Sequence, residues 1–245
     1  MGFSTHRAVV GVDDSPASQA AQAWATDLVG DVRAVHVAEG AVADELERIA
    51  DDCGADLIVV GMHAQRRRVL RTLGPVVGTL LRCAKRPVAV VAEQPAAPGP
   101  AGSVVVGIGQ SAATERAVRW AAAFAAHQGV RLELVRALPH RPVFRPDGLL
   151  DLLAFYIDPA MAAEWAAQDI EAFVAEVDRS TNSEVAVDWS VPPGRPGPVL
   201  VEAGDHAQLL VIGIHDRTGT DGNEVPSWCR HVLLHAPCPV VFVPG

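Results

Sequence analysis

Short apolar runs alternate with longer amphipathic stretches along the whole chain. Such alternation is typical of strands separated by helices, because a buried strand is continuously apolar whereas a helix is apolar on one face only. Ser15 followed by Pro16 predicts a helix that runs to about residue 29, since serine caps a helix N-terminus and proline fits its first turn. The predicted strands are residues 8–13, 32–38, 57–61, 87–92, 103–108, 131–137, 184–190, 209–213 and 239–243.

The chain contains an internal repeat. Residues 8–15 (Ala-Val-Val-Gly-Val-Asp-Asp-Ser) are echoed by residues 104–111 (Val-Val-Val-Gly-Ile-Gly-Gln-Ser) at an offset of 96. Two later matches share an offset of 152, namely residues 57–61 with 209–213 and residues 87–91 with 239–243. The offset therefore grows by about 56 residues, which the second copy carries and the first lacks.

A segment rich in proline and glycine, residues 94–102, is predicted to be a linker between the copies. Residues 1–93 then form a shortened domain and residues 103–245 a full one. The additional part of the second copy contains a helix opening at Asp158-Pro159, with apolar residues on one face: Ala166, Ile170, Phe173, Val174 and Val177. The first copy thus lacks one helix–strand unit, and we predict four parallel strands there against five in the second.

Three separated motifs resemble those of the universal stress protein family. They are V-G-V-D-x-S-P-x-S at residues 10–18, L-I-V-V-G at 57–61 and H-A-P-C-P-V at 235–240. The resemblance covers nearly the whole chain, twice. It implies an α/β fold of two tandem doubly wound parallel-sheet domains, of the adenine nucleotide alpha hydrolase-like type, with the first copy shortened.

The resemblance also implies an arrangement of the two copies. Members of the family commonly dimerise through their last strand, so residues 88–91 are expected to pair with residues 240–243 inside one chain as a pseudo-dimer. A homodimer of the whole chain is a further expectation from the family.

In the ATP-binding members of the family the nucleotide lies at the carboxyl ends of the strands. Carried over to the first copy, the resemblance places Asp13 near the sugar and base and Val37 near the adenine. The family's phosphate loop reads G-x-x-G, nine residues, then G-[S/T], and it places Gly61 and Gly74 at the phosphates. Glycines there let the backbone approach phosphate closely.

The first copy departs from that loop at two positions. Ala64 replaces the second glycine, and Pro75 replaces the Ser/Thr, so a backbone N–H and a hydroxyl are both lost. The arginines at residues 66–68 offer replacement charge for phosphate, and the alternative is a solvated loop with no ligand.

The second copy departs further. It keeps Gly213 and Ser227 as remnants of the phosphate loop, but Gly109 stands where the acidic residue belongs. Asp216 replaces the second glycine and Pro226 the third. Because a carboxylate at Asp216 would repel phosphate, we predict that the second copy does not bind ATP in the family manner.

Two functional hypotheses follow, and an enzyme is a distant third. The leading one is a stress-response binding and regulatory module with degenerate nucleotide sites, which acts through protein partners. The alternative is a protein that binds ATP or another adenine nucleotide in its first domain. No convincing nucleophile and base support a nucleotide-dependent enzyme, since Ser15 and Ser111 are better explained as helix caps.

Composition narrows the class further. A formal net charge of -9 disfavours nucleic acid, which needs clustered Lys and Arg to neutralise its phosphates. No apolar stretch approaches the roughly 20 residues that a membrane helix needs, and the four scattered cysteines form no C-x-x-C pair. The chain is therefore expected to be cytoplasmic, without a membrane or a disulfide framework.

Two competing motifs are incomplete. Residues 107–112 (Gly-Ile-Gly-Gln-Ser-Ala) imitate a dinucleotide fingerprint, but the acidic residue expected after the next strand is missing. His231 and His235 have a zinc-binding spacing without a third ligand, so no metal site is predicted. His36 alternates with valines in a predicted strand and is interpreted as a packing position.

Overall fold

The computed structural model describes residues 7–36, 41–63, 73–93, 102–109, 111–138, 159–180, 185–214 and 225–245. Its strands are β1 (Arg7–Val12), β2 (Asp31–His36), β3 (Leu57–Met62), β4 (Val88–Ala92), β5 (Ser103–Gly107), β6 (Leu132–Val135), β7 (Val187–Ser190), β8 (Ala207–Ile214) and β9 (Val240–Pro244). Its helices are α1 (Pro16–Leu28), α2 (Val42–Cys53), α4 (Pro75–Cys83), α5 (Ala112–Gln128), α7 (Pro159–Ser180), α8 (Pro196–Ala203), the 3-10 helix η1 (Gly204–His206) and α9 (Ser227–His235).

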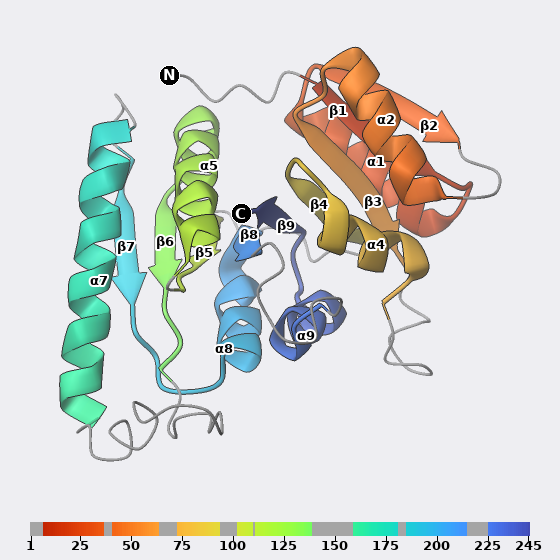
Figure 1. Cartoon of the computed structure of the whole chain (residues 1–245). Coiled ribbons are helices and arrows are strands. Elements are labelled where there is room, and N and C mark those ends of the chain that lie inside the picture. Colours follow the sequence, from red (N-terminus) through yellow and green to blue (C-terminus); the bar gives the residue numbers. More distant parts are fainter. Residues whose placement is uncertain are drawn as a thin grey trace.

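The strands form one sheet in the order β2-β1-β3-β4-β9-β8-β5-β6-β7 (Figure 1). Neighbouring strands are parallel except for β4 and β9, which are antiparallel. The predicted α/β class is confirmed, and each predicted strand range coincides with one of these strands. Some ends differ, since the range 184–190 begins as a strand only at Val187. The last two residues of the range 32–38 lie outside the described residues.

The repeat is visible in the topology. We call residues 7–93 the first half and residues 102–245 the second half. The order β2-β1-β3-β4 in the first half corresponds to β6-β5-β8-β9 in the second, with β7 added at the outer edge. Helices α4 and α9 begin and end at the predicted offset of 152, whereas α7 and β7 have no counterpart among the described residues of the first half. The expected four strands against five are confirmed; because the missing strand is an edge strand, its loss leaves the remaining pairings intact.

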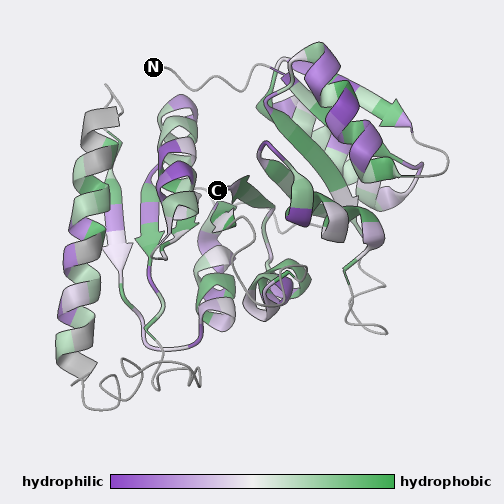
Figure 2. Cartoon of the chain, in the orientation of Figure 1, coloured by the Kyte–Doolittle hydropathy of each residue, from purple (hydrophilic) through white to green (hydrophobic). Residues whose placement is uncertain are grey.

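Helices cover both faces of the sheet. Helices α1, α5 and α7 pack on one face, over a cluster that includes Ala8, Val10 and Leu134. Helices α2, α4, α8 and α9 pack on the other, over a cluster that includes Val9 and Val35. Figure 2 shows the central strands β3, β4 and β9 as almost uniformly hydrophobic. Such continuous apolar runs are expected where a sheet is covered on both sides.

Matching serines start the two corresponding first helices. The Ser15 hydroxyl oxygen accepts the Ser18 N–H at 3.1 Å, and that of Ser111 accepts the Thr114 N–H at 3.2 Å. Both serines have extended backbone geometry at the N-cap position, as predicted. Each side chain satisfies one N–H group that the first helical turn would otherwise leave unpaired.

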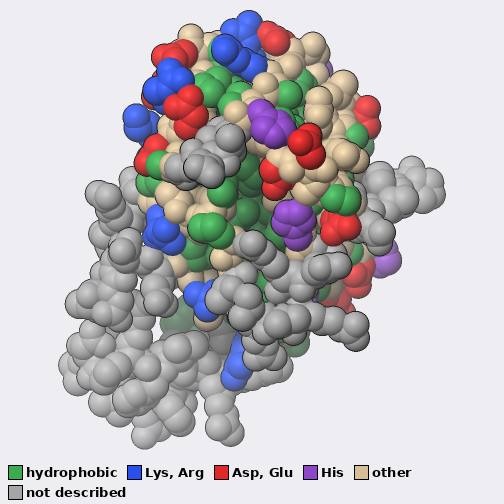
Figure 3. All heavy atoms as spheres, turned by 90° about the vertical axis from the view of Figure 1, so that its right-hand side faces the viewer, with side chains coloured by type: hydrophobic (Ala, Val, Ile, Leu, Met, Phe, Trp, Pro, Cys, Tyr) green, Lys and Arg blue, Asp and Glu red, His purple; other side chains and the backbone are tan. Residues whose placement is uncertain are grey.

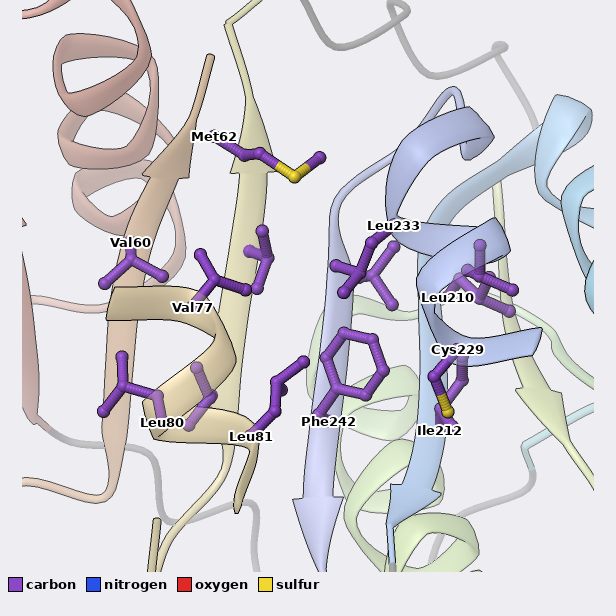
Figure 4. Close-up of a cluster of buried hydrophobic side chains, with 14 of the residues drawn as sticks. Val60, Met62, Val77, Leu80, Leu81, Leu210, Ile212, Cys229, Leu233 and Phe242 are labelled. Atoms are coloured by element: carbon purple, nitrogen blue, oxygen red, sulfur yellow. The ribbon is translucent and has the colours of Figure 1, made fainter. Parts of the chain in front are cut away.

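Strands β4 and β9 join the two halves. Val88, Ala89 and Val90 lie opposite Phe242, Val241 and Val240. This confirms the predicted pairing of the two last strands within one chain. Figure 4 shows Phe242 between side chains of α4 and of α9, and Phe242 is 1% exposed. The halves therefore share one continuous core across this strand pair, which we call the seam.

An ion-pair network in the first half ties the start of β4 to α2. The Glu47 carboxylate accepts the Lys85 N–H at 3.1 Å and the Arg86 Nε–H at 3.2 Å. Arg86 also donates to the Ala55 carbonyl at 2.7 Å and to Asp51. The Glu47 and Arg86 side chains are only 11% and 14% exposed. Because both charges are largely removed from water, each depends on the other for compensation.

The second half replaces this network with apolar residues. At the offset of 152, Val199 stands in place of Glu47 and Cys238 in place of Arg86. Both are buried, at 7% and 4% exposure. The same corner of the fold is thus packed in two chemically different ways within one molecule.

We predict that Glu47→Ala lowers the free energy of unfolding by about 3 kcal/mol, which is the lower end of the range observed when one partner of a buried ion pair is removed. The effect should be at this lower end because Asp51 and Ala55 still contact Arg86. The double variant E47V/R86C, which copies the second half, should cost less than Glu47→Ala alone, because it leaves no buried charge unpaired. Chemical denaturation followed by circular dichroism measures both. A double variant less stable than Glu47→Ala would contradict this account.

Candidate functional site

In the first half, the carboxyl ends of the parallel strands bring two aspartates and two histidines together. Asp13 and Asp14 follow β1, His36 ends β2 and His63 follows β3. The His63 Nε2 atom lies 3.7 Å from Asp13 Oδ2, and His36 Nε2 lies 3.7 Å from Asp14 Oδ2. Figure 3, which looks onto this end of the molecule, shows histidine side chains beside acidic ones. All four side chains are at least 40% exposed, so they line an open surface.

Asp13 is held by the first turn of α1. Its Oδ1 atom accepts the Ser15 hydroxyl at 2.5 Å and the Ser15 N–H at 3.2 Å, while its own N–H donates to the Ser18 hydroxyl at 3.3 Å. The Ser15 hydroxyl is the main cause that lowers the pKa of Asp13, partial burial opposes it, and His63 adds a smaller lowering. The carboxylate is therefore fixed in direction and ionised at neutral pH.

The turn that carries these residues is conformationally unusual. Asp14 has a backbone φ of 58°, the one positive φ among the described residues other than glycine. Aspartate tolerates this left-handed conformation better than most residues. It turns the chain from the end of β1 into α1, and it leaves the Asp14 side chain 92% exposed.

The predicted phosphate-loop residue Gly74 is the N-cap of α4. Its φ and ψ are -55° and 151°, and its carbonyl accepts the Gly78 N–H at 2.9 Å. Pro75 follows as the first helical residue, which has no N–H to offer a ligand. In α9 the order differs, since Pro226 is the N-cap and Ser227 the first helical residue. Neither helix has a side-chain cap.

The predicted site residues Gly61 and Gly213 have a packing role that needs no ligand. A Cβ atom on Gly61 would lie 2.4 Å from the backbone C and O of Ala17. One on Gly213 would lie 2.5 Å from the same atoms of Ala113. Glycine is required at both positions because β3 and β8 touch the backbone of the first turns of α1 and α5.

The structure thus brings together only part of the predicted site. Asp13 and Gly61 both contact the start of α1, and Gly74 begins α4. Val37 lies outside the described residues, as do Ala64, the arginines at 66–68 and Asp216.

Sequence reasoning missed the two histidines. His36 was interpreted as a packing residue, but its side chain is 54% exposed, because β2 is an edge strand and this residue is its last. His63 had no motif of its own. The signal that could have found both is their position directly at strand ends, next to Asp13 and Asp14 after the neighbouring strand.

Metal and membrane features can be stated for the described ranges only. Within them, no three His, Cys, Asp or Glu side chains are grouped to hold a metal ion. The rings of His231 and His235 stack 4.3 Å apart, and His235 Nδ1 lies 2.8 Å from the His231 carbonyl oxygen. No helix in the described part of the chain has the length and apolar character needed to cross a membrane.

We predict that Gly61→Ala and Gly213→Ala each destabilise the fold by about 1–3 kcal/mol, because the obstacle is backbone that cannot rotate away. Gly30→Ala is the matched control, since no atom lies within 4 Å of its Cβ position. It should leave stability unchanged or raise it by up to about 1 kcal/mol. Thermal and urea unfolding measure all three. Equal effects at Gly30 and Gly61 would contradict the packing role.

We predict that Ser15→Ala raises the pKa of Asp13 toward its ordinary value, because the strongest hydrogen bond to the carboxylate is removed. In the native protein the lowered pKa stabilises the fold above the pKa of the unfolded chain, and this contribution is lost as pH falls through the folded value. NMR titration of the Asp13 carboxyl carbon measures it. Ser111→Ala, which removes the matching cap of α5, should leave Asp13 unchanged; equal shifts in both variants would refute the assignment.

Comparison with proteins of known sequence finds relatives in mycobacteria. Universal stress protein Rv1996 of Mycobacterium tuberculosis is 31% identical over 191 residues, which is 76% of this chain and 57% of that protein. Universal stress protein Rv2005c of the same species is 30% identical over 194 residues, 76% of this chain and 61% of that protein. This chain therefore matches less than two thirds of the length of these relatives.

Solved structures share the fold. A universal stress protein from Archaeoglobus fulgidus superimposes with a TM-score of 0.62 at 15% identity, covering 99% of both chains. The protein PA1789 from Pseudomonas aeruginosa, of unknown function, gives a TM-score of 0.54 at 16% identity over 98% of this chain and 82% of its own. Another universal stress protein is in complex with cAMP, but its TM-score of 0.38, at 24% identity over 58% of this chain and 96% of that one, says nothing about what this chain binds.

The family model described as "Universal stress protein family" matches residues 25–92 and 101–244. The first stretch ends at residue 92, just before the predicted linker at 94–102, and the second begins at residue 101, just before β5. Since the matched residues make up well over half of its length, the chain belongs to the universal stress protein family.

Proposed function

We propose that the chain is a non-catalytic binding and regulatory module in the stress response, whose two halves do not hold ATP by the family's phosphate loop. The observation that carries this proposal is the proline at the start of each helix that would face the phosphates. Pro75 is the first residue of α4, and Pro226 caps α9. Each proline removes one of the four N–H groups with which a helix N-terminus binds an anion.

In the first half, the remaining features support sugar or base contacts better than phosphate contacts. Asp13 is ionised and held by Ser15, and Asp14 adds a second carboxylate beside it. Ala64 in the sequence removes the second glycine of the loop. Negative charge without a full set of N–H donors disfavours a triphosphate.

In the second half, a different part is missing. Gly109 supplies no carboxylate where the first half has Asp13, while Asp216 introduces one in the phosphate loop. Ser227 still begins α9 with an N–H and a hydroxyl. Both halves lack the second glycine of the loop and each lacks a further part of the site, so neither is a complete copy to which ATP binding would be assigned.

The environments of four candidate nucleophiles support a non-catalytic role. The Ser15 and Ser111 hydroxyls are engaged as helix caps. Burial raises the pKa of the Cys229 and Cys238 thiols, which keeps both as neutral thiols rather than reactive thiolates. The partner that we propose for the module is another protein.

The proposal is tested on freshly purified full chain. We predict that denatured protein releases no adenine compound by mass spectrometry and that ATP produces no thermal shift. The double variant A64G/P75S restores two parts of the phosphate loop and should gain an ATP-dependent shift, because bound ligand stabilises the native state. Pro226→Gly is the matched control and should gain none, since Asp216 remains.

The alternative function has its own outcome in the same experiment. Adenine nucleotide released from the wild-type chain, with a thermal shift that Asp13→Ala abolishes, would establish nucleotide binding in the first half and overturn the proposal. A wild-type shift that Asp13→Ala leaves unchanged would also overturn it, by placing a nucleotide elsewhere.

A further inference from the structure

Within the described residues, the sheet ends in two edge strands that pair on one side only, β2 in the first half and β7 in the second, at opposite sides of the molecule (Figure 1). Free edges carry unpaired backbone N–H and C=O groups that can pair with another strand. We propose that β2 of one copy pairs antiparallel with β7 of a second copy, so that chains associate head to tail. This inference goes beyond the proposed function and does not depend on it.

In the described residues, no helix covers β2 in the way that α7 covers the corresponding part of the second half. In the second half, helix α7 packs beside α5, and Leu132 and Leu134 of β6 are 0% exposed. The described residues of the first half contain no such helix, and on its matching strand β2 Val32 is partly exposed and Ala34 is exposed. The second half thus shows what fits on this face: an apolar helix–strand unit.

At the β7 edge, by contrast, large apolar side chains are exposed. The large hydrophobic side chains that stand exposed in the described residues all belong to α7 and β7: Met161 at 45%, Trp165 at 51% and Trp189 at 43%. Met161 and Trp165 are one helical turn apart and lie on one side of α7. Exposed tryptophans are typical anchors of protein interfaces. One end of the sheet therefore exposes apolar surface that matches the uncovered strand at the other.

Figure 3 looks onto the β2 end and shows hydrophobic side chains there between charged ones. Alternation along β2 places Val32 and Ala34 on the α1 face of the sheet and Arg33 on the opposite face, with Val35. In β7, Val187 packs on the same face as α1 and α5, so Trp189 shares it and Asp188 lies on the other.

One antiparallel register of β2 against β7 places the apolar side chains of both strands on the same face of the sheet. Two copies placed edge to edge in the same orientation bring β2 and β7 together antiparallel, because β4 and β9 reverse the strand direction between the halves. With Arg33 opposite Asp188, Val32 meets Trp189 and Ala34 meets Val187 on the helix-covered face. Arg33 is exposed and makes no ion pair within the described residues. Asp188 already lies 3.4 Å from Arg131 of its own chain, so in this contact its carboxylate would lie between two arginines.

Charge also favours the pairing of β2 with β7 over the symmetric pairings of β2 with β2 or of β7 with β7. Two β2 strands centred on Arg33 would set guanidinium groups opposite each other, and two β7 strands centred on Asp188 would oppose carboxylates. The head-to-tail contact pairs opposite charges instead. Because such a contact does not close on itself, species should grow in size with concentration.

Sedimentation velocity of the full chain over a concentration series tests the proposal. The wild type should form dimers and larger species. Arg33→Asp and Asp188→Arg should each weaken association by about tenfold or more, since each places like charges across the contact. Their equimolar mixture should restore it as alternating chains, and so should the double variant R33D/D188R.

Matched controls are Arg116→Asp and Glu202→Arg, which reverse exposed charges on α5 and α8 away from both edges. Both should associate like the wild type, and thermal unfolding checks that every variant is folded. A wild type that stays monomeric throughout overturns the proposal. So does association sensitive to Arg33→Asp alone or to Asp188→Arg alone, which would indicate symmetric β2 or β7 contacts.

Discussion

The antiparallel contact between β4 and β9 is the interaction on which the rest of the molecule depends. All five residues of β4 are buried, and β9 is buried along four of its five. Separated halves would each expose a wholly apolar edge strand, which is an unstable and aggregation-prone arrangement. Joined, the two strands extend one core through the molecule, with α1 and α5 beside them on one face and α4 with Phe242 on the other. A shortened first half is tolerable because its inner edge is completed by the second half.

Much of this fold could be predicted from the sequence, because the repeat fixed the order of elements and their offsets. Ser15 and Ser111 located the starts of α1 and α5, and the apolar runs located the strands. What could not be predicted depended on tertiary context. The strand range 184–190 shortened to β7 because an edge strand has one neighbour to bond, and the exposure of His36 followed from the same position at an edge.

The candidate site was less predictable than the fold, for a physical reason. A glycine in a motif does not show by itself whether packing or a ligand requires it. Gly61 and Gly213 match the family's loop, yet the structure gives each a steric role against Ala17 or Ala113 that persists without a ligand. Their presence is therefore poor support for a nucleotide. Asp13 carries more information, since two hydrogen bonds from Ser15 hold its carboxylate in a set direction.

The reversal of strand direction at the seam has a consequence for how the protein engages other molecules. The carboxyl ends of β1 and β3 open toward one rim of the sheet, and those of β5 and β8 open toward the opposite rim. A molecule held at Asp13 and one held at Ser227 would face away from each other and could not compete sterically. The two rims are therefore separated by the sheet, and a molecule bound at one of them would leave the other accessible.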